Sequence, residues 1–274
     1  MGRGTLNAND NRVTLRIQSH GDVTQVLMTS TVGRSIGYDV SAYLTRSVLV
    51  DLGFPLVARA VARYLTRARP DGILITHHHE DHGGNAELAA RMGIPIGASD
   101  ATLALLQQPV HLALHRRVIW GNPPPLRAPI TAFSSDALRL VPTPGHASDH
   151  HIVWDAERET IFGGDLFLGV KVRAAHPDER PRALVRSLRH AAALRPRRFF
   201  DAHRGVVRDP VSALLAKADW LDDTIGAIER RIAEGWSNRA IARAVLGRED
   251  LAYYVSRGAM SRLMFVARVR DEVA

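Results

Sequence analysis

After a polar start, apolar and β-branched residues are grouped in short runs that Gly and Asp interrupt. Such runs are typical of antiparallel strands, and they predict strands over residues 13–17, 23–29, 42–44 and 48–50. Between the second and third runs, two glycines and an aromatic residue in 33–38 predict a turn. This part of the chain is therefore expected to form one half of a sheet sandwich.

From Pro55 onward, helical apolar spacing alternates with short buried runs, which is the pattern of an α/β fold. Helices are expected over residues 56–67, 85–92, 100–107 (capped by Ser99) and 182–194. Strands are expected over 72–75, 94–98, 138–141, 152–155, 160–162 and 198–202, the last of these being the last strand of the domain. The proline-rich stretch 109–129 predicts an extended excursion.

Beyond Pro210 the pattern becomes helical, with helices expected over 212–231, 238–246 and within 253–269. Ser237 is expected to cap the second of these, and the arrangement looks like part of a helix-turn-helix or winged-helix module. The chain is therefore divided into a flexible leader (1–12), a main domain (13–209) and a small C-terminal helical module (210–274).

Composition narrows the class of protein and the kind of metal site. The chain has 274 residues and no cysteine, so disulfides, thiolate nucleophiles and cysteine ligands are excluded. No apolar run approaches the ~18 residues that a membrane span needs, and the leader lacks the apolar core of a secretion signal. We therefore expect a cytoplasmic protein that does not associate with membranes.

The formal net charge of +8 is concentrated in one segment. Residues 171–209 hold eleven basic and four acidic side chains, whereas residues 210–274 hold ten basic and nine acidic ones. The basic segment is compatible with RNA as a partner, but a solvated surface is the favoured interpretation. A nearly neutral C-terminal module favours packing, dimerisation or cleft-lining over nucleic-acid reading, and a homodimer stays an open prediction.

The stretch Thr76 to Gly84 combines imidazoles and carboxylates directly after the strand predicted over 72–75. It contains the spacing His-x-His-x-Asp-His, formed by His77, His79, Asp81 and His82. Nitrogen and oxygen donors of this kind suit a borderline divalent metal ion. A remnant of an affinity tag would lie at a terminus and would not alternate with acidic residues behind a strand. The loop therefore predicts a metal site.

This spacing resembles the signature of the metallo-β-lactamase-fold hydrolases, and further motifs of that family follow in order. Asp51 stands where the family has an acidic residue behind the ligands, and Thr-Pro-Gly-His places His146 in a tight turn. Gly-Gly-Asp ends at Asp165, and His203 follows the strand predicted over 198–202. The resemblance implies an αββα four-layer sandwich, with His150 as a structural histidine in the second turn.

The resemblance also implies the ligands and the chemistry. One metal ion is assigned to His77, His79 and His146, a second to Asp81, His82 and His203, with Asp165 between them. Zinc is the favoured ion, with manganese and iron as alternatives. A hydroxide bridging the two ions is the expected nucleophile. Asp81 is the candidate catalytic residue that orients it and moves a proton. Asp51 is expected to hold an imidazole N–H, and His78 and Glu80 are expected to be spacers.

Candidate substrate contacts are less specific, since Tyr38, Lys171 and Arg173 are each favoured as bystanders. The histidines His111 and His115 are interpreted as structural because no acidic residue lies near them. The loops expected to choose the substrate are 33–39, 109–129 and 167–176.

Three functions stay open within the resemblance. The absence of cysteine disfavours the cysteine-containing β-lactamases, and His79 disfavours the flavodiiron type. The favoured function is hydrolysis of a small acyl substrate (thioester, ester or lactone), and the C-terminal helices are similar to those of the glyoxalase II and β-lactamase-like-protein-2 branches. The alternatives are a single-strand-specific endoribonuclease and a persulfide dioxygenase with one iron.

Overall fold

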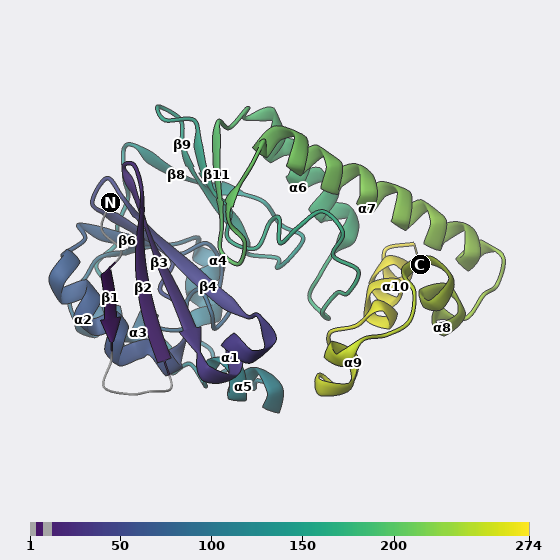
Figure 1. The fold of residues 1–274 in the computed structure, drawn as a ribbon, viewed down its shortest axis with the longest axis horizontal. Helices are drawn as coiled ribbons and strands as arrows, with labels where there is room; N and C mark the ends of the chain where they lie inside the picture. Colours follow the sequence, from purple (N-terminus) through teal and green to yellow (C-terminus); the bar gives the residue numbers. More distant parts are fainter. Residues whose placement is uncertain (1–3, 8–12, 274) are drawn as a thin grey trace.

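The computed structural model describes residues 4–7 and 13–273, which form two sheets between outer layers of helices (Figure 1). The first sheet has the order β1-β2-β3-β4-β5-β6-β7 and the second the order β12-β11-β10-β9-β8. The first sheet's strands are β1 (Gly4–Asn7), β2 (Val13–His20), β3 (Val23–Ser30), β4 (Asp39–Thr45), β5 (Val48–Val50), β6 (Gly72–Leu74) and β7 (Ile96–Gly97). The second sheet's strands are β8 (Leu138–Pro142), β9 (His151–Asp155), β10 (Thr160–Phe162), β11 (Arg198–Asp201) and β12 (Gly205–Val207).

The helices lie outside both sheets and continue to the C-terminus (Figure 1). Those of the first half are α1 (Thr31–Ile36), η1 (Pro55–Val57), α2 (Ala58–Ala68), α3 (Ala86–Arg91), α4 (Asp100–Leu106) and α5 (Leu114–Trp120). Those of the second half are α6 (Pro181–Ala193), α7 (Pro210–Ala233), α8 (Asn238–Ile241), the π-helical η2 (Ala242–Leu246), α9 (Leu251–Val255) and α10 (Arg262–Asp271). No helix in the described ranges is long and apolar enough to cross a bilayer.

Three apolar clusters separate the four layers and confirm the predicted αββα sandwich. Between the sheets, Tyr43 and Val50 of the first sheet pack against Phe162 and Phe200 of the second. A second cluster joins the outer face of the first sheet to α2 and α3, and a third joins the second sheet to α6 and α7. Burial of these side chains stabilises the sandwich and holds the strand ends in fixed positions.

The strand pairing agrees with the hydrophobic pattern in most places. Strands β2 to β5 are antiparallel neighbours, and β9 and β10 form the predicted hairpin. The later strands β5, β6 and β7 are parallel, as alternation with helices requires. The expectation that 198–202 is the last strand of the domain is wrong, because β12 follows and pairs antiparallel to β11. The three-residue β12 was too short to show an alternating pattern.

Two loops expected to be irregular contain helices. The predicted turn at 33–38 is instead the end of α1, which Ser30 caps by accepting a hydrogen bond from the Gly33 N–H at 2.9 Å. The predicted extended excursion at 109–129 contains α5, whose Trp120 is buried against Phe54. Tertiary packing of an aromatic side chain decided this helix against the surrounding prolines.

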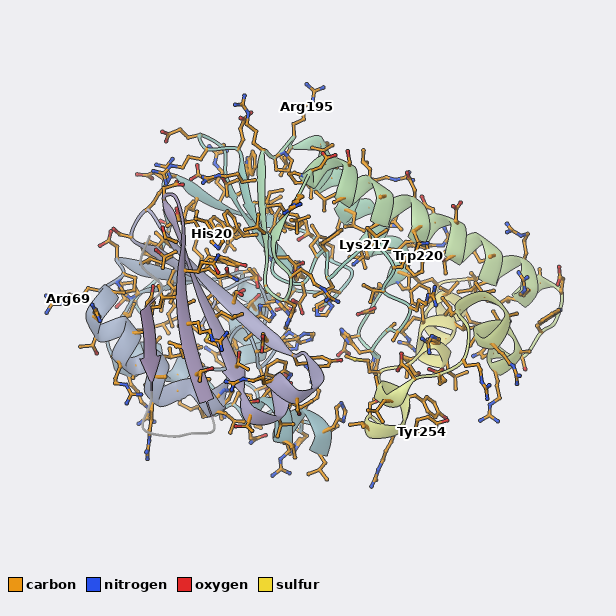
Figure 2. All side chains as sticks on the ribbon, in the orientation of Figure 1. His20, Arg69, Arg195, Lys217, Trp220 and Tyr254 are labelled. Carbon is orange, nitrogen blue, oxygen red and sulfur yellow. The ribbon has the colours of Figure 1, made fainter. Side chains whose placement is uncertain are left out.

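Part of the N-terminal leader and the first C-terminal helix both pack against the sandwich. Gly4–Asn7 pairs with β2 as β1, so this part of the leader is ordered, and the remainder of the leader lies outside the described residues. Helix α7 packs along α6 and shares an apolar cluster with the second sheet. Figure 2 shows Lys217 and Trp220 on the inner side of α7. The division of the chain at residue 210 stays a prediction.

Candidate metal centre

The loop after β6 places its histidines and carboxylates in one buried space. The backbone N–H groups of His82 and Gly83 both donate to the His79 carbonyl, at 3.0 and 2.8 Å, so the loop turns sharply. His77, His79 and His82 are at most 5% exposed, and Asp81 is 6% exposed. Such a turn directs polar side chains inward at the end of a buried strand, where they meet polar residues from other strand ends.

Asp51 organises this loop from behind, as expected. Its Oδ1 accepts a hydrogen bond from the Thr76 N–H at 2.8 Å, and its Oδ2 lies 2.8 Å from Nδ1 of His82. With Nδ1 donating to this carboxylate, the neutral imidazole that a metal ion requires has its lone pair on Nε2 of His82. The predicted role of Asp51, holding an imidazole N–H, is confirmed.

The first donor set consists of His77, His79, His146 and Asp165, whose donor atoms all lie within 4.8 Å of one another. Nδ1 of His79 is 3.1 Å from Nε2 of His146, and the latter is 3.2 Å from Oδ2 of Asp165. Such short separations between nitrogen and oxygen donors are those that ligands of one cation show. The structure therefore brings together the four residues predicted for the first metal ion.

The second donor set consists of Asp81, His82, Asp165 and His203, again within 4.8 Å of one another. Oδ1 of Asp165 lies 3.2 Å from Nε2 of His82 and 3.2 Å from Nε2 of His203. Oδ2 of Asp81 lies 3.3 Å from Nε2 of His203. The other nitrogen of His203, Nδ1, donates to the Asp39 carbonyl at 2.7 Å, which fixes the ring. All seven residues predicted as ligands thus meet in one cluster.

Buried polar atoms that lack a hydrogen-bond partner indicate that these residues fit a metal centre. Among the described residues, Nε2 of His77, Nε2 of His82 and Oδ1 of Asp165 are buried without a hydrogen-bond partner. The cost of such buried polar atoms is high unless a ligand satisfies them. Imidazole and carboxylate donors at this spacing suit zinc, manganese or iron.

Electrostatics within the cluster divide the predicted ligands into neutral histidines and histidines whose charge facing carboxylates favour. Burial lowers the pKa of His77 and His79 well below the ordinary value, so both imidazoles stay neutral, as ligands must be. Burial opposes the charge of Asp165 as well, but the histidines that face it hold its pKa well below the ordinary value. Burial alone would lower the pKa of His146, yet mainly the Asp165 carboxylate raises it to about 9. The carboxylate is thus placed to balance cationic charge.

The turn before Asp165 needs glycine for its backbone and for its neighbours. Gly164 has φ +49°, and a Cβ there would lie 2.8 Å from Nε2 of His150 and 2.9 Å from Oγ1 of Thr76. Nε2 of His150 accepts the Asp165 backbone N–H at 3.0 Å, and Nδ1 of His150 lies 2.9 Å from Oγ1 of Thr143. Burial lowers the pKa of His150 to about 3, which keeps it a neutral acceptor. Its predicted structural role is confirmed.

The two spacers of the loop point to partners outside both donor sets. Nδ1 of His78 lies 2.8 Å from Oδ1 of Asp149. Glu80 accepts two hydrogen bonds from Arg116 of α5, at 2.6 and 2.7 Å. The helix that the sequence did not predict therefore holds one end of the metal loop.

The structure adds residues that the sequence analysis did not single out. His176 packs its ring 4.7 Å from that of His146 and 5.2 Å from that of His79, measured between centroids. Oε1 of Glu179 lies 3.4 Å from both His146 Nδ1 and His176 Nε2. Glu179 thus faces the nitrogen of His146 that points away from the donor set. The only signal in the sequence was the string His-Pro-Asp-Glu, 176–179, at the end of a candidate substrate loop.

The candidate substrate contacts separate into two groups. The Tyr38 ring lies 6.2 Å from that of Trp120, which in turn lies 6.3 Å from that of His203, so Tyr38 flanks the centre. The Tyr38 hydroxyl also contacts Sδ of Met260 in the C-terminal module at 3.6 Å. Lys171 and Arg173 are exposed, and within the described chain neither forms an ion pair with a donor residue.

A sheet sandwich with this cluster at its strand ends defines a class of metal-dependent proteins, and comparison with known families identifies it. The model of the metallo-beta-lactamase superfamily matches residues 37–203, more than half of the chain. The chain belongs to this superfamily. The matched region extends from the Tyr38 segment to His203 and includes every predicted ligand.

Two curated relatives show which branches the chain is similar to. The beta-lactamase-like protein 2 homolog of Drosophila melanogaster is 29% identical over 215 residues, 68% of this chain and 68% of that protein. A hydroxyacylglutathione hydrolase of Rhodospirillum rubrum is 36% identical over 94 residues, 34% of this chain. The match spans only about a third of that hydrolase, 32% of its length.

Solved structures show the same fold. A metallo-beta-lactamase family protein from Thermus thermophilus superposes with a TM-score of 0.58 at 18% identity, covering 97% of this chain and 96% of that one. TTHA1623, solved in a di-iron-bound form, superposes with a TM-score of 0.52 at 26% identity, covering 65% of this chain and 92% of that one. The first likeness extends through the C-terminal helices.

Proposed function

We propose that the chain is a metal-dependent hydrolase that acts on a small acyl substrate (a thioester, ester or lactone) at two divalent ions, with zinc favoured. One observation carries this proposal: the two oxygens of Asp165 face different donor sets. Oδ2 lies 3.2 Å from His146, and Oδ1 lies 3.2 Å from His82 and from His203. When bound, two such ions polarise an acyl carbonyl and lower the pKa of a water toward neutrality.

The chain's own residues then orient the reactants and move the proton. His203 is the most exposed donor, with 16% of its side chain accessible, so substrate is expected to approach from its side. Asp81 lies next to it, with Oδ2 3.3 Å from His203 Nε2, and is the candidate proton acceptor for the attacking water. Trp120 and Tyr38 flank the same side and exclude water from an apolar acyl group.

The relatives support acyl chemistry in general terms. A curated relative that matches about a third of the chain is named a hydroxyacylglutathione hydrolase, a name that denotes hydrolysis of an acyl group carried by glutathione. The absence of cysteine keeps every donor in the site a nitrogen or an oxygen. The name of that relative favours hydrolysis of an activated acyl group.

Cleavage of single-stranded RNA is the second candidate, motivated by the beta-lactamase-like protein 2 relative and the basic segment 171–209. The contacts of that segment weigh against it. Arg189 pairs with Asp219 and Asp222 of α7, and Arg197 and Arg198 pair with Glu159 and Asp22. Arginines already paired with acidic groups are poorly placed to bind phosphates, so the acyl substrate is preferred.

The test combines elemental analysis of the protein as purified with assays of a thioester, a lactone and an oligoribonucleotide. We expect about two metal ions per chain and turnover of the thioester or lactone that a chelator abolishes. His82→Ala should abolish turnover, whereas His111→Ala, which changes an exposed histidine, should not. Salt-sensitive cleavage of RNA alone would favour the nuclease. A single iron, with oxygen consumed in the presence of a persulfide, would favour the dioxygenase and contradict hydrolysis.

A further inference from the structure

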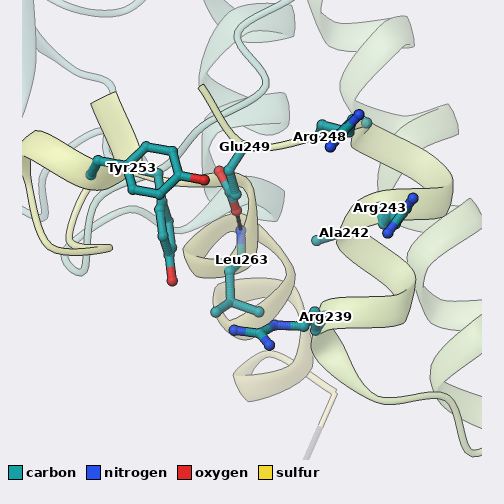
Figure 3. A pocket seen from close by; sticks show the side chains of 9 residues that line it. Arg239, Ala242, Arg243, Arg248, Glu249, Tyr253 and Leu263 are labelled. Carbon is teal, nitrogen blue, oxygen red and sulfur yellow. Dashed lines mark hydrogen bonds between the residues drawn. The ribbon is translucent and has the colours of Figure 1, made fainter. Parts of the chain in front are cut away.

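The C-terminal module contains a pocket of about 230 Å³ that shares no residue with the metal centre. It lies where α8 and η2 face α9 and the start of α10. Figure 3 shows Tyr253 on one side of the hollow and Arg243 and Arg248 on the other, with Leu263 between them. Its walls are formed by nine residues: Arg239, Ala242, Arg243, Gly247, Arg248, Glu249, Tyr253, Tyr254 and Leu263.

Three arginines of this pocket have no acidic partner in the part of the chain that the structure describes. Within residues 4–7 and 13–273, no ion pair involves the side chains of Arg239, Arg243 or Arg248. Other arginines of the same module are paired, such as Arg262 with Asp250 at 3.2 Å. All three are exposed, so they give the rim of the pocket a positive charge that an anion from solution can reach.

The one carboxylate in the wall is already engaged. Oε2 of Glu249 accepts the backbone N–H of Arg262 at 3.1 Å, and Oε1 accepts that of Leu263 at 2.8 Å. These bonds satisfy donors of the first turn of α10, so Glu249 serves the helix end and does not pair with the arginines. The lining therefore keeps a positive balance of three basic groups against one acid.

An aromatic wall completes the pocket. The rings of Tyr253 and Tyr254 stand nearly perpendicular, at 89° with centroids 5.2 Å apart. Tyr254 is 70% exposed, which is unusual for a large aromatic side chain beside a hollow. Flat rings of this kind pack well against a planar ligand group, and their hydroxyls add hydrogen-bond donors.

We propose that this pocket binds a phosphate ester joined to a planar ring, as in a nucleotide. The planar, multidentate guanidinium group matches the oxygens of a phosphate better than those of any neutral group. The phosphate would lie between Arg243, Arg248 and Arg239, and the planar ring would lie against Tyr253. A ligand that carries both groups would contact the arginines and the tyrosines of the lining.

The pocket is connected to the metal centre by the segment between its lining residues Tyr254 and Leu263. Met260 contacts the Tyr38 hydroxyl, and Ser261 pairs through its backbone with Ala175, one residue before His176. The phosphate therefore has two candidate sources: the tail of an acyl carrier that reaches from the pocket to the centre, or a separate ligand. Only the first of these rests on the proposed acyl hydrolase.

Calorimetric titration of the metal-loaded full chain with ADP tests the pocket. We expect saturable binding that Arg243→Ala weakens by roughly tenfold or more, because a charge-assisted hydrogen bond to phosphate is lost. Arg257→Ala is the matched control, since Arg257 is an exposed arginine of the same module outside the pocket. It should leave the affinity within about twofold. Unchanged melting temperatures would show that both variants fold.

The proposal would be overturned by no ADP binding by the wild type, by equal weakening in both variants, or by equal binding by the wild type and Arg243→Ala. The last result would assign the phosphate to another part of the chain, such as the metal ions. Tight binding of an oligoribonucleotide without binding of ADP would also overturn it, in favour of a nucleic-acid surface.

Hydrolysis assays identify the source of the phosphate. A substrate tail predicts that Arg243→Ala raises KM about tenfold for a thioester of a nucleotide-bearing thiol, leaves KM for p-nitrophenyl acetate unchanged, and makes ADP a competitive inhibitor. A separate ligand predicts ADP binding without competition. If the wild type does not hydrolyse p-nitrophenyl acetate, the proposed hydrolase is contradicted, whereas the proposed ligand of the pocket is not.

Discussion

Oδ2 of Asp51 and Nδ1 of His82 lie 2.8 Å apart, although thirty-one residues separate them in the chain. This contact determines which nitrogen of His82 carries the proton, and so whether Nε2 can act as a ligand. Asp51 also accepts the backbone N–H of Thr76, at the first residue of the metal loop. One carboxylate thus sets both the position of the loop and the tautomer of a ligand.

We expect Asp51→Asn to weaken binding of the second metal ion by about 10- to 100-fold. With its oxygen still accepting from Thr76, the new amide would donate to His82 Nδ1 and move the imidazole proton to Nε2. Metal content measured during titration with a chelator checks this, with Asp71→Asn, an exposed acid, as the control. Equal metal affinity in the two variants would contradict the role of Asp51.

Asp165→Ala is expected to lose both metal ions, because the two donor sets share this carboxylate. Removing it also leaves His82, His146 and His203 facing one another without the anion that separates them. Elemental analysis after gel filtration measures the stoichiometry. A variant that keeps two ions per chain would refute the bridging role of Asp165.

Gly164→Ala is expected to reduce activity at least tenfold while the protein remains folded. The added Cβ would meet His150 and Thr76 at under 3.0 Å, and moving either would displace Asp165. Gly93→Ala is the matched control, because Gly93 also has a positive φ of +71° but has nothing within 4 Å of the new Cβ. Strain alone should cost each variant about 1 kcal/mol, measured by denaturant unfolding. Equal activity in both variants would show that the clash is harmless.

Lys217 predicts a specific dependence of stability on pH. Its ammonium is buried beneath α7 and donates to the carbonyls of Leu166 and Phe167, just after Asp165. Burial lowers its pKa from 10.5 to about 8. The unfolded chain therefore binds more protons between these values, so the free energy of unfolding rises from pH 8 to 10.5 by about 3 kcal/mol from this group.

Lys217→Met should remove this rise, since methionine does not titrate, and Lys171→Met, at an exposed lysine, should retain it. Denaturant unfolding at several pH values between 8 and 10.5 measures the difference between each variant and the wild type. The same slope in wild type and Lys217→Met would show that Lys217 titrates normally.

The sequence alone determined the chemistry of the site. The loop 76–84 follows an apolar strand, and its metal-donor residues lie close together in the sequence. Their spacing and the position of the strand were therefore enough to predict a metal site. The family motifs then predicted His146, Asp165 and His203, which the structure brings into the same cluster. Ser99 and Ser237 were also recognised as helix caps because capping depends on a few neighbouring residues.

Only the tertiary structure decided which side chains support those donors. Arg116 reaches Glu80 from a helix that its proline-rich surroundings concealed, and Glu179 faces His146 from a loop with no recognisable period. The pairing of Tyr38 with Met260 joins residues more than two hundred positions apart. Local patterns report on contacts within a few residues, whereas these contacts exist only because the two sheets pack and carry distant loops to one edge.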